Sequence, residues 1–166
     1  MFKLSVLFNI DGSFQMLHER LSQALKEAMR NKDQCRVSTI RLILAAIKDR
    51  EIAKRGDGGD SGLDEEEILQ LLSKMVRQRQ DSKLQYEQAG RIDLAEREQQ
   101  EIDVISEFLP RQMDDAEIEA AVSAVIGELG ATGLKDMGRV MGTLKARHPG
   151  EMDFAKAGKL VKAALS

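Results

Sequence analysis

Apolar residues recur three or four positions apart along almost the whole chain, and no segment shows the strict apolar–polar alternation of a half-buried strand. This period predicts helices. The expected helices cover approximately residues 14–30, 34–55, 64–89, 93–109, 114–129, 135–147 and 153–165. We therefore predict an all-α protein, with a four-helix N-terminal domain followed by a small three-helix C-terminal domain.

Short polar residues stand where these helices begin, and glycine or proline stands where several of them end. The strongest start signal is Asp64 followed by Glu67, which has the spacing of a capping box. Leu63 and Ile68 around it have the spacing of a hydrophobic staple. Further N-caps are expected at Ser13, Asp33, Asp93, Asp114 and Asp153, and helix ends at Gly90, Pro110 and Gly130.

The stretch from Pro110 to Asp115 is the expected domain boundary, so the N-terminal domain covers 16–110 and the C-terminal domain 111–166. Residues 1–15 are expected to be a poorly ordered extension. They contain a short apolar run and one lysine, but no small-residue cleavage site follows. An extension, or an upstream start codon with Met16 as the working start, is therefore favoured over a signal peptide.

Composition narrows the class of protein. Hydrophobic residues make up 42% and aromatic residues 4%, so a sheet that stacks RNA bases on aromatic rings is not expected. The single cysteine, Cys35, excludes an internal disulfide and a cysteine-based zinc site. No apolar run approaches the roughly 20 residues of a membrane span. These features predict a cytoplasmic protein without a membrane partner.

The formal net charge of −3 conceals a basic C-terminus, because residues 134–166 hold seven Lys and Arg against three acidic residues. On a helical wheel, Gly138 and Gly142 lie beside the apolar face formed by Leu134, Met137, Val140, Met141 and Leu144. Basic residues border this strip of bare backbone and form an outer face on the last helix. They are Lys135, Arg139, Lys145, Arg147, Lys156, Lys159 and Lys162.

Two interpretations of this pattern stay open. Glycines four positions apart allow a second helix to pack closely, and an exposed row of lysines is commonly just solvated. Alternatively, bare backbone bordered by cations suits contact with RNA phosphates, without base readout by aromatic rings. The same choice applies to Arg77, Arg79 and Lys83 on the third helix, for which a solvated face is the simpler interpretation.

The residues that commonly carry catalysis do not form a recognisable site. His18 and His148 are far apart in sequence, and neither belongs to a metal-binding motif. Cys35 is expected to be half-buried near a helix start, and Glu65 and Glu66 to be a solvated first turn. We expect no metal, no cofactor and no enzymatic activity.

Three stretches in this order resemble the YqeY family: KDQCRVSTIRLILAAIKDREI, RQRQDSKLQYEQAGRIDLAEREQQEIDVISEFLPRQM and LKDMGRVMGTLK. The resemblance covers residues 16–166. That family consists of small bacterial proteins, so the resemblance implies a bacterial protein. Its members are similar to the C-terminal tail of one subunit of the tRNA-dependent amidotransferase, a tail that helps to hold the tRNA and carries no catalytic residues. The resemblance thus implies two helical domains and a link to tRNA, and any carbon–nitrogen ligase label would come from the relative.

The resulting hypothesis is a non-catalytic, tRNA-associated helical module. Its phosphate contacts are expected from the seven basic residues named above, with Gly138 and Gly142 as structural or close-contact positions. The alternative hypothesis is an adaptor that docks on an amidotransferase or an aminoacyl-tRNA synthetase without touching RNA.

Overall fold

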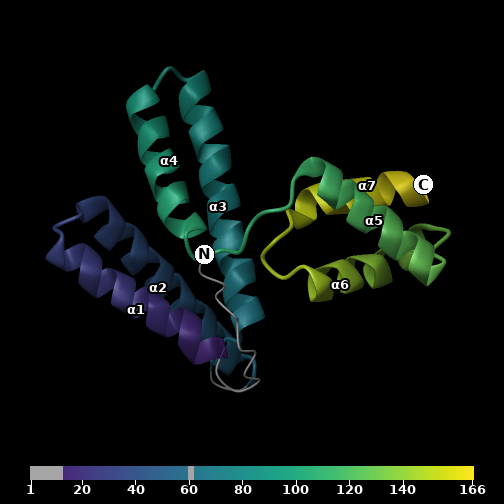
Figure 1. Cartoon of the computed structure of the whole chain (residues 1–166), viewed down its shortest axis with the longest axis horizontal. Coiled ribbons are helices and arrows are strands. Elements are labelled where there is room, and N and C mark those ends of the chain that lie inside the picture. The colour runs from purple at the N-terminus through teal and green to yellow at the C-terminus, as the bar shows by residue number, and fades with distance from the viewer. Residues whose placement is uncertain (1–12, 60–61) are drawn as a thin grey trace, which may run out of the picture. The chain divides into compact units, whose positions relative to one another are not determined.

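The computed structural model describes residues 13–59 and 62–166, with side chains from Leu17 onward, and this part of the chain contains helices and no strand (Figure 1). The all-α prediction is confirmed for these residues. The helices are α1 (Ser13–Arg30), α2 (Gln34–Gly56), α3 (Glu65–Gln88), α4 (Ile92–Ser106), α5 (Asp115–Leu129), the short 3-10 helix η1 (Leu134–Asp136), α6 (Met137–Arg147) and α7 (Phe154–Leu165).

The chain divides between Phe108 and Leu109 into two compact units. The N-terminal unit contains α1 to α4, and the C-terminal unit contains α5, η1, α6 and α7. None of the helices in the described residues is long and apolar enough to cross a membrane.

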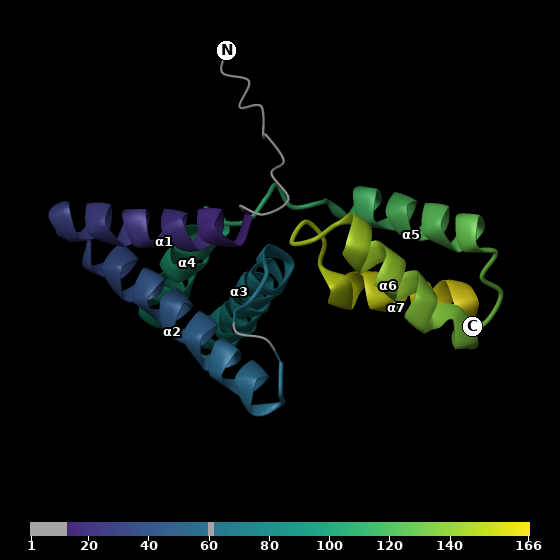
Figure 2. The ribbon, with the colours of Figure 1, turned by 90° about the horizontal axis from the view of Figure 1, so that it is seen from below.

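Two helical hairpins make up the N-terminal unit, α1 with α2 and α3 with α4 (Figures 1 and 2). The far end of the α3–α4 hairpin extends beyond α1 and α2 (Figure 1), and Leu84 and Ile92 near that end are 54% and 55% exposed. The core lies where the two hairpins meet. Its largest fully buried side chains are Leu17, Leu21, Ile40, Ile43, Ile47, Leu63, Ile68, Leu72 and Ile105.

Most predicted helix starts are confirmed by hydrogen bonds. Asp64 and Asp114 each accept from the backbone N–H three residues on, and Glu67 and Glu117 accept in return from the cap backbone N–H. Both α3 and α5 therefore begin with a capping box. Asp33 and Asp153 cap α2 and α7 as predicted, and Gly130 ends α5 in the left-handed conformation.

The predicted limits of the fourth helix are wrong at both ends. The N-cap of α4 is Arg91 rather than Asp93, and no side chain caps the helix. Asp93 lies inside the first turn, where its carboxylate accepts from the Arg91 guanidinium at 3.2 Å. The helix ends at Ser106, before the predicted limit at Leu109.

The predicted single helix over 135–147 is also wrong at its start. Leu134, Lys135 and Asp136 form the 3-10 turn η1, and α6 begins at Met137. A 3-10 turn has about three residues per turn, so a residue within it leaves the face that an α-helical wheel assigns to it. Leu134 accordingly is 53% exposed instead of joining the apolar face.

The first helix begins at Ser13, inside the segment predicted as an extension. The structure does not describe the side chains of Ser13 and Met16, so the predicted cap at Ser13 and the predicted start at Met16 stay predictions. Residues 1–12 lie outside the described residues altogether, and the prediction of a poorly ordered extension stays a prediction there.

Candidate nucleic-acid interface

The basic residues of the C-terminal unit are positioned by a core shared among α5, α6 and α7. Val140 and Leu144 on α6 and Ala157 and Val161 on α7 are fully buried in it. Met113 donates its backbone N–H to the carbonyl of Glu151 at 2.7 Å, and this bond joins the segment before α5 to the α6–α7 loop. The orientation of α6 and α7, and so of their outward side chains, follows from these contacts.

Gly138 and Gly142 lie on the exposed surface of α6. A Cβ atom added at either glycine would have no described atom of another residue within 4 Å, outside the helix's own backbone. Within the described residues, no second helix packs against these glycines. At Gly158 of α7, in contrast, an added Cβ would be in ordinary van der Waals contact with α6, 3.9 Å from the Cε of Met141.

Three of the predicted basic residues form ion pairs or hydrogen bonds with carboxylates or carbonyls of their own unit. Arg147 pairs with Glu128 at 2.7 Å, and Lys156 pairs with Asp115 at 2.8 Å. Arg139 donates to the carbonyl of Leu129 at 3.1 Å and pairs with Asp136 at 3.4 Å.

The charges in these pairs affect one another's protonation. The hydrogen bond from Arg147 lowers the pKa of Glu128, and the hydrogen bond to Asp115 raises the pKa of Lys156. The pKa of Asp136 is lowered mainly by the backbone N–H of Thr132, with Arg139 contributing less. Glu128 and Asp136 therefore remain charged at neutral pH and offset the charges of Arg147 and Arg139.

The other four basic residues are exposed and form no ion pair in the part of the chain that the structure describes. They are Lys135, Lys145, Lys159 and Lys162. Sequence reasoning missed the three carboxylates that pair with the other basic residues. Asp115 and Glu128 come from a different helix, whereas Asp136 lies three positions before Arg139, a spacing that the sequence does show.

Helical geometry places the unpaired lysines of α6 and α7 on one face. At about 100° per residue, Lys145, Gly138 and Gly142 follow Met141 around α6 on the side away from Arg147, and Lys135 precedes them in η1. Met141 contacts α7 at Gly158, so this side of α6 borders α7.

Around the axis of α7, in the same rotational sense, Gly158 is followed by Lys162, then by Lys159 and last by Lys156. Lys156 pairs with Asp115 of α5. The unpaired lysines of the two helices thus lie on either side of the seam between α6 and α7. We call this surface, formed by Lys135, Gly138, Gly142, Lys145, Lys159 and Lys162, the outer face.

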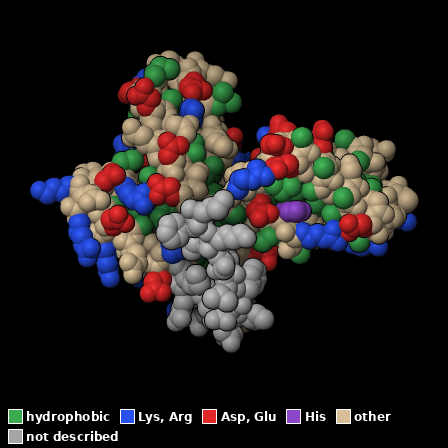
Figure 3. Space-filling model, in the orientation of Figure 1, with side chains coloured by type: hydrophobic (Ala, Val, Ile, Leu, Met, Phe, Trp, Pro, Cys, Tyr) green, Lys and Arg blue, Asp and Glu red, His purple; other side chains and the backbone are tan. Residues whose placement is uncertain are grey.

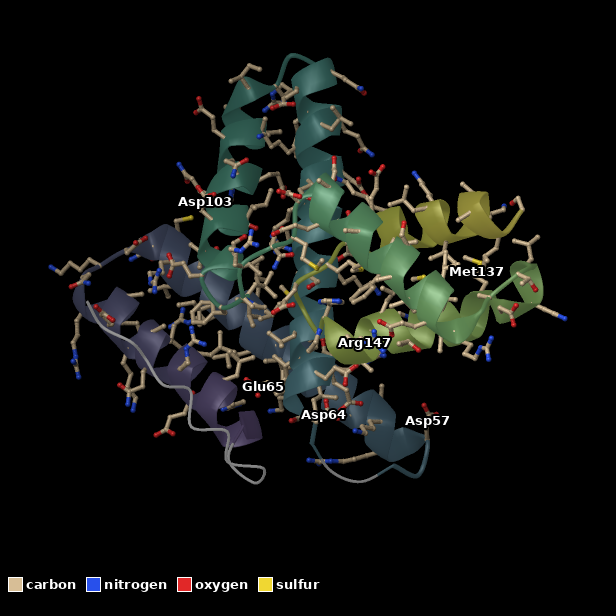
Figure 4. The ribbon with its side chains drawn as sticks, turned by 45° about the vertical axis from the view of Figure 1, so that its right-hand side comes forward. Asp57, Asp64, Glu65, Asp103, Met137 and Arg147 are labelled. Atoms are coloured by element: carbon tan, nitrogen blue, oxygen red, sulfur yellow. The ribbon has the colours of Figure 1, made fainter. Side chains whose placement is uncertain are left out.

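The figures show where α6 and the charged side chains of the C-terminal unit lie. Met137 and Arg147 mark the two ends of the helix in Figure 4, and Lys and Arg side chains gather over α6 along the lower edge of the C-terminal unit in Figure 3. Most of this edge carries no acidic side chain in that view, whereas acidic side chains gather where α5 begins.

The basic residues predicted on the third helix have a structural role. Arg79 donates to Glu101 at 2.8 Å with both side chains mostly buried, and Lys83 donates to Gln99 at 2.8 Å. Both bonds join α3 to α4. Arg77 is exposed.

The residues considered for catalysis lie on different elements. Cys35 is half-buried in the first turn of α2, as predicted, and His148 lies 3.4 Å from Glu151 in the α6–α7 loop. Among the described residues, no group of three or more His, Cys, Asp and Glu side chains could hold a metal ion.

Comparison with known families supports one assignment. The family model described as Yqey-like protein matches residues 18–165. The chain belongs to the YqeY-like family. This confirms the resemblance inferred from the three sequence stretches, which extended over nearly the same residues.

Relatives of this YqeY-like chain include yeast proteins named "altered inheritance of mitochondria protein 41, mitochondrial". The protein of Lachancea thermotolerans is 40% identical over 111 residues, which cover 66% of this chain and 57% of that protein. The protein of Vanderwaltozyma polyspora is 33% identical over 124 residues, covering 70% and 64%. The protein of Clavispora lusitaniae is 36% identical over 127 residues, covering 75% and 71%. The chain thus spans about 57 to 64% of the length of the first two relatives.

These relatives contradict the prediction of a cytoplasmic, bacterial protein, because their names assign them to mitochondria and their organisms are yeasts. The bacterial source was implied by the family resemblance, and the cytoplasmic location rested on a single cysteine and on the lack of a long apolar run. A protein of the mitochondrial interior shares both features, so they do not distinguish the two compartments.

Proposed function

We propose that this YqeY-like protein is a non-catalytic module that contacts tRNA through the outer face of its C-terminal unit, with the N-terminal unit serving as an arm or docking surface. The observation that carries the proposal is the pair of exposed glycines, Gly138 and Gly142, among four lysines without ion pairs in the described residues.

Phosphate contact needs cations that are free to exchange counterions for nucleic-acid phosphates. A lysine already paired with a carboxylate must first give up that partner, so Lys156 is a weaker candidate than Lys159 or Lys162. Exposed glycines add backbone that a bulky phosphate can approach closely. The outer face carries no aromatic side chain, which favours contact with backbone and shape over base readout.

The proposal can be tested by measuring tRNA binding over a range of salt concentrations. Changing Lys145, Lys159 and Lys162 to Gln should weaken binding at least about tenfold at low salt. It should also reduce the slope of log K against log salt by about 2 to 3, roughly one for each phosphate that is no longer neutralised.

The matched control changes three paired cations, Arg139, Arg147 and Lys156, to Gln and removes the same formal charge. Binding by this variant should weaken much less, because the carboxylates Glu128 and Asp115 already offset two of those charges. Equal losses in the two variants would show that net charge matters and the outer face does not. Salt-independent binding would also contradict the proposal.

The adaptor hypothesis and an enzymatic role predict different results. A protein partner recovered from a lysate after nuclease treatment, with no tRNA recovered and no binding to purified tRNA, would replace the proposal with the adaptor. Glutamine-dependent amidation of charged tRNA by the purified protein alone would overturn the non-catalytic part of the proposal.

A further inference from the structure

A second exposed surface, on α2 of the N-terminal unit, has a regular pattern that the proposed function does not use. Arg41, Ala45, Lys48, Ile52 and Arg55 are all exposed, and they follow one another at intervals of four, three, four and three residues. We call these five residues the α2 stripe. At 1.5 Å per residue the α2 stripe is about 21 Å long and nearly parallel to the helix axis.

The 4–3 spacing is that of the seam by which one helix packs along another. Small or aliphatic residues, Ala45 and Ile52, alternate with the cations along the α2 stripe, and Ile52 is 56% exposed. Leu42 beside it is 47% exposed. The opposite side of α2 is buried through Ile40, Ile43 and Ile47, so the stripe faces away from the core.

The cations of the α2 stripe are not used within the chain. Arg41, Lys48 and Arg55 form no ion pair or side-chain hydrogen bond with any residue that the structure describes. Lys54, in contrast, turns toward α3 and pairs with Glu67 at 2.8 Å. The α2 stripe therefore combines three unneutralised positive charges with exposed aliphatic surface in one line.

We propose that the α2 stripe docks an acidic amphipathic helix of a partner protein. Carboxylates at heptad spacing would meet Arg41, Lys48 and Arg55, and apolar residues between them would cover Ala45 and Ile52. An RNA backbone would match the charges but would gain nothing from an exposed isoleucine. A membrane surface favours a wide apolar face, whereas this line alternates aliphatic and charged positions.

A second copy of the chain fits the α2 stripe less well. Its α4 presents exposed acidic and amide side chains at the same kind of spacing, but no apolar residue lies among them to cover Ile52. Two of its carboxylates are already paired, Glu107 with Arg36 and Asp93 with Arg91. This α4 series consists of Asp93, Glu96, Gln100, Asp103 and Glu107.

The test uses two synthetic helical peptides and the whole protein. Both peptides carry Leu at the heptad positions that face Ala45 and Ile52. One carries Glu at the positions that face the cations, and the other carries Lys there. Fluorescence anisotropy should show binding of the Glu peptide and not of the Lys peptide. Changing Arg41, Lys48 and Arg55 to Glu should weaken binding of the Glu peptide at least about tenfold and should create binding of the Lys peptide, because the charges are exchanged.

Two further variants control for the change in net charge and for the contribution of Ile52. Lys26, Lys74 and Arg77 are exposed and off the α2 stripe, and changing all three to Glu should leave binding of the Glu peptide within about twofold. Ile52→Ser should weaken it several-fold, with far-ultraviolet circular dichroism confirming an intact fold. Equal losses in the two triple variants, or no exchange of specificity, would overturn the proposal.

Competing occupants are measured directly. The proposal also fails if vesicles of phosphatidylcholine with phosphatidylserine, or a short RNA duplex, bind through the α2 stripe while the Glu peptide does not. Concentration-dependent self-association that the stripe triple variant abolishes would instead assign the surface to a second copy. Loss of tRNA binding through the outer face is a separate result, since the outer face and the α2 stripe share no residue.

Discussion

At the scale of single residues, substitutions at the two glycines of α6 can test whether their surface packs against another helix or contacts RNA. Gly138 and Gly142 have helical neighbours on both sides and open space where a Cβ would lie. Glycine in a helix interior is less favourable than alanine by roughly 0.5–1 kcal/mol. We therefore expect Gly138→Ala and Gly142→Ala each to raise the free energy of unfolding by about that amount in urea denaturation.

Larger side chains at the same positions separate folding from function. Gly138→Leu with Gly142→Leu should leave the fold intact while obstructing tRNA binding, because the leucines would project into the outer face. Gly158→Leu is the contrast, since its side chain would meet Met141, and overpacking of this kind costs about 1–3 kcal/mol. If the double variant unfolds the C-terminal unit, these glycines serve packing after all.

The sequence could locate these glycines on the helix but not their neighbours. A helical wheel places Gly138 and Gly142 beside the apolar face, which is the pattern of both a packing site and an exposed strip. Gly158 also lies beside the apolar face of its own helix, but a Cβ added there would contact Met141 of α6. The difference depends on how α6 and α7 are rotated against each other, and that is set by the whole core.

At the scale of helices, the capping residues differ in a way that stability measurements can detect. Asp64 accepts a hydrogen bond from the backbone N–H of Glu67 at 2.8 Å, whereas Asp93 accepts from the Arg91 side chain. Removing an N-cap side chain costs about 1 kcal/mol. We expect Asp64→Ala to lower the free energy of unfolding by about that amount. Asp93→Ala should change it much less, because ion pairs between exposed side chains contribute little to stability.

The contrast between these two aspartates shows what local sequence can predict. Asp64 is supported by several independent signals, including Glu67 at N3 and the buried pair Leu63 and Ile68. For Asp93, the residue type is the only signal that predicts an N-cap. A neighbouring arginine two positions earlier competes for its carboxylate, and the N-cap falls one residue after Gly90, where the chain turns.

The capping box of α3 also predicts a dependence on pH. The hydrogen bond from Lys54 is the main cause that lowers the pKa of Glu67 below its ordinary value of 4.5, with help from the Asp64 backbone N–H. A lowered folded pKa adds stability above the unfolded value, and this stability is lost as pH falls through the folded pKa. Glu67→Gln should therefore reduce the slope of unfolding free energy against pH below about pH 4.5. An unchanged slope would mean that other carboxylates dominate acid unfolding.

At the scale of the whole molecule, the division of the chain between Phe108 and Leu109 raises the question of whether the second unit folds alone. Its core is complete within itself, with α5 contributing Ile118, Val122 and Val125 and α7 contributing Val161 and Leu165. A core this small rarely supplies more than about 3–5 kcal/mol. We predict that residues 109–166 alone will be helical and will unfold cooperatively, with stability near that range.

Substitution in the intact chain provides an independent test of the same division. Leu144 is fully buried in the core of the C-terminal unit, and Leu→Ala at such sites costs about 2–5 kcal/mol. That loss is comparable to the whole stability expected of the unit. Hydrogen exchange in full-length Leu144→Ala should therefore show reduced protection in α5, α6 and α7, while amides of α2 and α3 keep theirs. Uniform loss across both units would show that they fold as one.

The same fragment ties the division of the chain to its proposed function. If the outer face is sufficient for tRNA contact, residues 109–166 should bind tRNA with nearly the salt dependence of the whole chain, because the same phosphates are neutralised. The N-terminal unit would then contribute through the α2 stripe to a protein partner, and deleting it would abolish binding of the acidic peptide only. A folded fragment that no longer binds tRNA would instead place essential phosphate contacts in the N-terminal unit. Arg77 on α3, exposed and without an ion pair among the described residues, would then be the first position to change.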